Sequence, residues 1–139
     1  MKLEQEFLVN RPRETVARRL DDDVTFAALF PKTHVTRSAE GRRETCTPLR
    51  VLGREREVRF VFETLPDGNV RFAKICDGNV WRSLEGEVRL EEKDTETTRL
   101  RLRMEGRTRS FVPEITIRIP MREQITQMAG ALKRRLERS

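Results

Sequence analysis

A run of alternating apolar and polar residues in the second half of the chain constrains the fold most strongly. Four segments there repeat with a period of two, which is typical of strands that bury one face: residues 57–64, 70–77, 80–90 and 97–106. Turn signals at 65–69 (Leu-Pro-Asp-Gly-Asn) and 77–79 (Asp-Gly-Asn), and a polar stretch around 91–97, separate these segments. Because such short connections favour hairpins, we expect one antiparallel sheet.

A single amphipathic helix is predicted after these strands. In residues 121–139 the apolar side chains follow helical spacing and form one stripe: Met121, Ile125, Met128, Leu132 and Leu136. Gly130 lies within this helix, where glycine costs about 1 kcal/mol relative to alanine, so it marks a weak or closely packed point. The conformation of residues 107–119 is left open, because Pro113 and Pro120 flank an alternating apolar piece.

The N-terminal part of the chain predicts a strand, two short helices and two further strands. The expected ranges are a strand over 2–9, helices over 10–20 and 21–31, and strands over 33–38 and 42–51 that turn near Glu40-Gly41. Asp23 is the predicted N-cap of the second helix. Because hairpin-connected strands are segregated from the helices, we predict a single α+β domain over residues 1–139.

The charge of the chain is compatible with a nucleic-acid partner but does not require one. The net charge is +6, the pI is near 10.1, and 24 Arg accompany 5 Lys. Clustered positive charge is the mark of phosphate binding, yet these arginines are scattered with acids between them. Arg is also well suited to pairing with carboxylates. A surface rich in ion pairs is therefore the favoured interpretation, and a nucleic-acid partner is the weaker one.

The sequence carries no motif for targeting, metal binding or catalysis. No apolar run approaches the length of a membrane span, and the start MKLEQEFLV lacks the apolar region of a signal peptide. We therefore expect a cytoplasmic protein, whose oligomeric state stays open. Cys46 and Cys76 have no zinc-ligand spacing and are expected to be buried thiols, while His34, the sole histidine, is predicted to lie at the surface. We predict no catalytic residue, no metal and no cofactor.

Several segments, taken in order, carry a resemblance to a known superfamily. They are FLVNRPRETVARRLDD (7–22), FAALFPKTHV (26–35), LEGEVRLEEKDTETTRLRLRMEG (84–106) and the C-terminal helix. In this order they resemble the START-like superfamily, also called SRPBCC or birch-pollen-allergen-like. The resemblance covers nearly the whole chain, although Val88 stands where relatives often carry Trp, and the region of Pro113 and Pro120 is harder to align.

The resemblance implies a helix-grip fold. In that fold a curved antiparallel sheet of six to seven strands wraps a long C-terminal helix, and two short helices follow the first strand. It also implies an internal cavity, between the sheet and this helix, for lipids, isoprenoids, polyketides or hormones. The binding of such a molecule is therefore an expectation from the resemblance, as is the alternative of a polyketide cyclase or aromatase.

Strand parity predicts which side chains face the interior. The five-residue connection at 65–69 pairs Phe62 with Phe72 and Phe60 with Lys74. In the next strand Arg82 is in phase with Leu84 and Val88, so it is predicted to face the core. A three-residue loop at 77–79 sets Lys74 opposite Arg82, both inward, whereas a two-residue loop turns Lys74 outward.

Charge pairing supports these registers. The pairing of Phe62 with Phe72 also sets Glu63 opposite Arg71. A pairing of Gly86 with Leu102 sets Glu87 opposite Arg101 and Glu85 opposite Arg103, and opposite charges across antiparallel strands are favourable. Much of the basic character of these strands is then explained as structural pairing.

These considerations define a predicted ligand site. Two cations side by side in an apolar enclosure are costly unless an anion joins them, so Arg82, with Lys74, is predicted to bind the polar head of an apolar ligand. The alternative is that Arg82 extends to solvent at a cavity mouth or pairs with an internal acid. Ordinary core packing is the more usual role of such apolar side chains. The predicted apolar walls are Phe60, Phe62, Phe72, Leu84, Leu102, Met121, Ile125, Met128 and Leu132.

The predicted function is the binding or carriage of a small hydrophobic or amphipathic molecule without chemistry. A cyclase would require a histidine or a carboxylate pair facing the cavity. A third hypothesis is a basic adaptor that binds RNA, the ribosome or a protein. It predicts a filled core, a contiguous basic patch and binding that is lost with added salt.

Overall fold

The computed structural model describes residues 1–39, 42–51, 53–76 and 80–138. Within them, seven strands form one antiparallel sheet in the order β1-β7-β6-β5-β4-β3-β2. The strands are β1 (Lys2–Val9), β2 (His34–Ala39), β3 (Arg42–Val51), β4 (Arg54–Thr64), β5 (Val70–Lys74), β6 (Trp81–Asp94) and β7 (Thr97–Thr108). The helices are α1 (Arg13–Leu20), α2 (Asp23–Ala27) and α3 (Glu114–Glu137).

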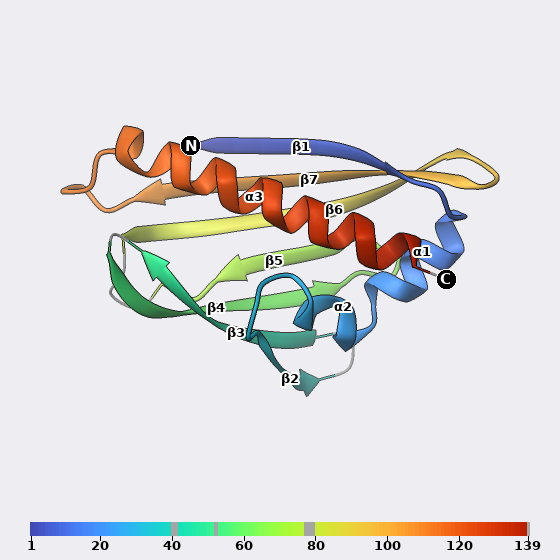
Figure 1. Ribbon diagram of the computed structural model, residues 1–139, viewed down its shortest axis with the longest axis horizontal. Coiled ribbons are helices and arrows are strands. Elements are labelled where there is room, and N and C mark those ends of the chain that lie inside the picture. Colours follow the sequence, from blue (N-terminus) through green and yellow to red (C-terminus); the bar gives the residue numbers. More distant parts are fainter. Residues whose placement is uncertain (40–41, 52, 77–79, 139) are drawn as a thin grey trace.

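The long helix α3 packs across one face of the curved sheet, with α1 and α2 near its C-terminal end (Figure 1). The predicted stripe of Met121, Ile125, Met128, Leu132 and Leu136 is buried, so its orientation toward the core is confirmed. At the end of α3, Arg19 Nη1 donates to the Leu136 carbonyl at 2.7 Å. The α+β class, the two short helices and the helix-grip arrangement are as expected.

Helix α3 begins before the segment predicted to be helical. Glu114 is its first residue, directly after Pro113, and Pro120 lies inside the helix. The alternating piece 114–119 is therefore helical, because proline is well tolerated just before a helix start and the carbonyl four residues before Pro120, that of Thr116, belongs to an exposed turn. Ile117 is buried while Ile115 and Ile119 are exposed, which is a helical and not a strand pattern.

The cap of α2 differs from the prediction. Asp22, not Asp23, is the N-cap, and its side chain accepts a hydrogen bond from the Val24 amide at 3.0 Å. Asp23 is the first residue of the helix and forms ion pairs with Arg37 and Arg43 at 3.1 and 3.0 Å. The Asp23 cap prediction is therefore wrong, because two arginines distant in sequence hold that carboxylate.

The predicted register between β4 and β5 is confirmed. Phe62 pairs with Phe72, Phe60 with Lys74 and Glu63 with Arg71. The Arg71 and Glu63 side chains form an ion pair of 3.2 Å.

The predicted register between β6 and β7 is wrong by two residues. Gly86 pairs with Met104, not Leu102, and Glu87 therefore lies opposite Arg103. The strands continue to Asp94 and from Thr97, with an irregularity between Glu92 and Asp94, so the turn lies later than the polar stretch suggests. Because side chains alternate with a period of two, a register shift of two residues leaves the same faces of β6 and β7 turned toward the core.

The shift leaves Arg101 to pair with β1. Its guanidinium lies 2.8 Å from the Glu6 carboxylate and 3.5 Å from that of Glu4. The hydrogen bond and charge of Glu6 raise the pKa of Arg101. The expected ion-paired sheet surface is present, but for β6 and β7 the partners differ from those predicted.

The prediction that Arg82 faces the core is also wrong. A bulge between Trp81 and Ser83 inserts Arg82 as an extra residue in β6, so Trp81 and Leu84 are buried while Arg82 and Ser83 are exposed. The Trp81 ring fills the space over Gly106, where a Cβ would lie 2.5 Å from its Cζ3 atom. Parity counted along an unbroken strand cannot anticipate such a bulge.

The predicted turns at Glu40-Gly41 and 77–79 lie outside the described residues, so the length of the second loop is not tested. Cys46 and Cys76 are free and half-buried, and His34 is exposed as predicted. Within the described ranges, none of the helices has the length and apolar character needed to cross a membrane.

Candidate functional site

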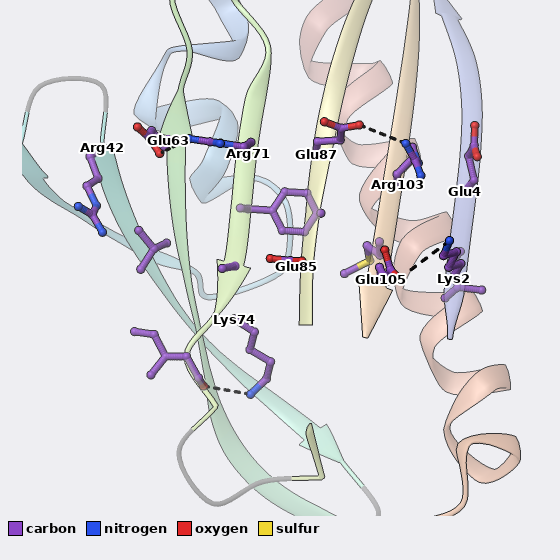
Figure 2. Close-up of a pocket in the computed structure, with 17 residues that line it drawn as sticks. Lys2, Glu4, Arg42, Glu63, Arg71, Lys74, Glu85, Glu87, Arg103 and Glu105 are labelled. Carbon is purple, nitrogen blue, oxygen red and sulfur yellow. Dashed lines mark hydrogen bonds and ion pairs between the residues drawn. The ribbon is translucent and has the colours of Figure 1, made fainter. Parts of the chain in front are cut away.

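An open trough of about 780 Å³ lies on the face of the sheet turned away from α3 (Figure 2). It forms where β5 and β6 separate, because these strands pair only from Val70–Val88 to Ala73–Glu85. Beyond that point the chain after β5 follows β4, and the Ile75 amide donates to the Arg59 carbonyl at 2.9 Å.

The charges of this outer trough largely neutralise one another. Five basic and five acidic side chains line it: Lys2, Arg42, Arg71, Lys74, Arg103, Glu4, Glu63, Glu85, Glu87 and Glu105. Arg71 pairs with Glu63, Arg103 with Glu87 at 3.5 Å, and Lys2 with Glu105 at 4.0 Å. Since both signs alternate along its walls, the trough offers no selective charge to an anion or a cation.

A second, enclosed cavity lies between the sheet and α3. Its volume is about 20 Å³, little more than one water molecule needs. Its walls come from the segment after α2, four strands and α3: Leu29, Phe30, Thr33, Thr45, Thr47, Val58, Phe60, Phe62, Phe72, Met104, Gln124, Ile125 and Met128. It occupies the place where the helix-grip resemblance implies a ligand.

Aromatic rings form the sheet side of this interior cavity. The centroids of Phe60, Phe62 and Phe72 lie 5.4 to 6.0 Å apart in tilted and edge-on pairs. Such pairs add about 1 kcal/mol each beyond their buried area. The rings therefore make a stable apolar wall.

A few polar groups meet this apolar wall. Thr33 Oγ1 donates to the Phe30 carbonyl at 2.9 Å and lies 2.7 Å from Thr47 Oγ1. Because a hydroxyl has one proton, Thr47 must donate to Thr33, which leaves lone pairs on Thr47 Oγ1. The side-chain amide of Gln124 has no hydrogen-bond partner within the described part of the chain.

The structure brings together only part of the predicted ligand site. Five of the predicted residues line the interior cavity: Phe60, Phe62, Phe72, Ile125 and Met128. Leu84, Leu102, Met121 and Leu132 are buried in the same core but do not line the cavity. Lys74 lies on the border of the outer trough, and Arg82 lines a separate surface hollow with Trp81 and Arg109. The role of all eleven in ligand binding stays a prediction.

Sequence reasoning missed the inner face of β3. Arg43, Thr45 and Thr47 alternate along this strand and are all buried, at 1%, 3% and 3% exposure. The alternation in RETCTPL predicts one shared face, but an Arg and two Thr give no apolar signal for burial. The missed Thr residues supply polar atoms of the interior cavity.

Arg43 is held in a cluster of its own beside that cavity. Its Nη2 donates to Asp21 Oδ1 at 2.9 Å and to the Asp21 carbonyl at 3.0 Å, while Nε lies 3.0 Å from Asp23 Oδ1. The guanidinium stacks over the Phe26 ring at 4.6 Å, and Thr64 Oγ1 donates to Asp21 at 2.8 Å. This Arg43 cluster joins the α1–α2 connection to β3 and β4.

Comparisons with known proteins agree with this geometry at the level of the fold. No family model matches the sequence, and no curated protein matches it either. The Zhui aromatase/cyclase from a Streptomyces species superposes with a TM-score of 0.77 at 17% identity, over 99% of this chain and 91% of that one. A START superfamily protein from Mycobacterium smegmatis has a TM-score of 0.73 at 16% identity, over 98% and 97%. The chain has the START-like fold.

A third solved structure, Ara h 8.0201, is also similar to this START-like fold. It superposes with a TM-score of 0.69 at 11% identity, over 98% of this chain and 97% of that one. The superpositions establish the START-like architecture. Because the sequence identities are low, the function must be argued from the residues of the site. In this START-like domain the cavity between sheet and helix has a volume of only about 20 Å³.

Proposed function

We propose that this protein binds a small hydrophobic or amphipathic molecule between the sheet and α3, without chemical conversion. The observation that carries the proposal is the interior cavity, in which aromatic and aliphatic side chains converge with a small number of hydroxyl and amide groups. Ligand pockets for small molecules combine these two features. A lipid, isoprenoid or polyketide-like molecule has the matching chemistry.

The polar groups would orient one end of the ligand. Thr47 Oγ1 offers an acceptor, and the Gln124 amide offers both a donor and an acceptor. Thr47 comes from β3 and Gln124 from α3, so both sides of the cavity contribute. A hydroxyl or carbonyl on the ligand would satisfy these groups, while apolar burial at roughly 25 cal/mol per Å² supplies the affinity.

Binding requires the cavity to widen from about 20 Å³. One part of the wall that belongs to no helix or strand is the segment from Leu29 to Thr33, between α2 and β2. Lys32 in this segment has φ 62°, and among the described residues it is the sole non-glycine residue with positive φ. Such a backbone is uncommon outside glycine. Outward movement of this segment would admit a ligand.

The cavity wall favours binding over catalysis. None of its described residues is an Asp, Glu, His, Cys or Lys, the groups that most often transfer protons in enzymes. His34 is exposed and does not line the cavity. The cyclase hypothesis therefore has no general acid or base at this site to rest on.

Two substitutions on one strand test the proposal. Val58 lies in the wall of the interior cavity and Val61 in that of the outer trough, both on β4. Val58→Phe places a ring where the ligand must go, so we expect the affinity for cis-parinaric acid to fall by at least about tenfold, or 1.4 kcal/mol. Val61→Phe should leave the affinity unchanged. Fluorescence titration of the probe measures both.

Other results would overturn the proposal. If Val61→Phe weakens binding and Val58→Phe does not, the outer trough is the site. If the wild-type protein neither binds the probe nor carries a small molecule in native mass spectrometry, binding in the interior is excluded. Unfolding curves of both variants check that any loss of binding does not come from loss of the fold.

A further inference from the structure

Three large apolar side chains project into solvent at the start of α3. Phe111, Ile115 and Ile119 are 75%, 80% and 66% exposed; we call these three residues the apolar tip. Elsewhere in the described chain Val24, at 52%, is the sole other large apolar residue of this kind. A group of exposed apolar side chains marks an interaction surface more strongly than a single one does.

The apolar tip follows from the geometry of the helix. Ile115 and Ile119 are one turn apart, so they share a face, whereas Ile117 and Met121 are buried on the opposite side. Phe111 precedes the helix in the β7–α3 loop. This loop and the first turn of α3 lie together at one end of the molecule, at the left in Figure 1.

Positive charge surrounds the apolar tip. Between residues 107 and 123 there are four arginines (Arg107, Arg109, Arg118, Arg122) and two acids, Glu114 and Glu123. The Glu114 carboxylate lies 3.4 Å from the amino group of Met1, so it is already paired. The Arg109 guanidinium lies 5.8 Å from the centroid of the Phe111 ring.

A hollow of about 450 Å³ beside Phe111 adds a further arginine. Arg82 and Arg109 both line it, together with Cys76, Trp81, Ser110 and Phe111. The bulge that turns Arg82 out of the core therefore brings it beside the apolar tip. Two guanidinium groups around one hollow can donate charge-assisted hydrogen bonds to the oxygens of a phosphate group.

Some arginines on the outer face of the sheet are already neutralised by acids. There Arg71, Arg101 and Arg103 each form an ion pair with a glutamate. Five arginines around the apolar tip form no ion pair with a described residue: Arg82, Arg107, Arg109, Arg118 and Arg122. Their charge is left for an external anion.

We propose that the apolar tip docks on a lipid bilayer that contains anionic lipids. Phe111, Ile115 and Ile119 enter the interfacial region, and the surrounding arginines contact lipid phosphates. A projecting apolar group with a cationic margin is the combination that interfacial binding requires. The charge complementarity favours this occupant over a second copy of the chain, whose tip would carry the same positive charge.

Vesicle co-sedimentation tests the proposal. The wild-type protein should bind vesicles of equal parts phosphatidylcholine and phosphatidylglycerol more tightly than vesicles of phosphatidylcholine alone. The double variant Ile115→Ser/Ile119→Ser should bind the anionic vesicles at least about tenfold more weakly. Arg118→Gln/Arg122→Gln should lose roughly fivefold per charge on these vesicles. The matched controls, Val24→Ser and Arg89→Gln, should bind as the wild type does.

Three results would overturn the proposal. The first is equal binding to neutral and anionic vesicles, or no binding to either. The second is wild-type binding by Ile115→Ser/Ile119→Ser, which would reduce the effect to charge attraction alone. The third is a dimer in sedimentation analysis without vesicles that this double variant dissociates, together with no vesicle binding. Since all substituted residues are exposed, each variant should keep the wild-type Tm.

Discussion

Replacement of Gly86 by alanine is expected to lower the free energy of unfolding by about 3 kcal/mol. A Cβ at this position would lie 2.3 Å from the Arg103 carbonyl oxygen and 2.4 Å from Cζ of Phe72. Neither neighbour yields readily, because the first is backbone of β7 and the second is a ring packed against Phe60 and Phe62. Urea unfolding of the variant measures the loss.

Gly130→Ala is the matched control, since it makes the same chemical change in a helix. The nearest atom to a Cβ there is Arg134 Nη1 at 3.3 Å, the end of a flexible side chain. Alanine is favoured over glycine inside a helix by about 1 kcal/mol, so this variant should be more stable than the wild type. The close packing considered for Gly130 is thus limited to one movable side chain. A Gly86→Ala protein as stable as Gly130→Ala would contradict the Phe72–Gly86 contact.

The double variant Asp21→Ala/Asp23→Ala is expected to lose about 3 kcal/mol or more of unfolding free energy. Both carboxylates neutralise Arg43, whose side chain is 1% exposed. Without them a buried cation keeps only the Asp21 carbonyl and the Phe26 ring as partners. Removal of one side of a buried ion pair is costly because the remaining charge stays away from water. Urea unfolding again measures the loss.

Arg43→Met provides the comparison from the other side of the same cluster. Methionine keeps much of the volume against Phe26 and leaves no buried charge. The carboxylates of Asp21 and Asp23 are 47% and 43% exposed, so water can hydrate them once Arg43 is gone. We therefore expect a clearly smaller loss than in the double variant. Equal losses would show that packing around Arg43, and not its charge, stabilises this cluster.

Local pattern was sufficient for most of the fold. The turn at 65–69 and the charges of Glu63 and Arg71 determined the β4–β5 register, because a hairpin of known loop length has one register. The apolar stripe of α3 could be predicted because its period differs from that of a strand. The start of α3 could not be predicted, because Ile115, Ile117 and Ile119 alternate as they would in a strand. The packing of the structure shows that, of these three, Ile117 is the buried one.

The candidate site was less predictable than the fold. Phe60, Phe62 and Phe72 were placed correctly on the inner face, because the parity of β4 is clear and the hairpin register carries it over to β5. Thr45 and Thr47 were missed, since a polar residue is buried only when a partner is available, and the partner of Thr47, Thr33, comes from a different segment. The outward position of Arg82 depends on the bulge beside Trp81, which no residue pattern in β6 signals.

The sequence by itself determined the class of fold, the order of its elements and the buried faces of β4, β7 and most of α3, because these depend on the periodicity of neighbouring residues. Only the tertiary structure decided where Arg43 and Arg82 lie. Arg43 is buried because Asp21 and Asp23 reach it from another part of the chain, and Arg82 is exposed because Trp81 takes the space over Gly106. Both outcomes come from contacts between residues distant in sequence, which periodicity along one strand does not record.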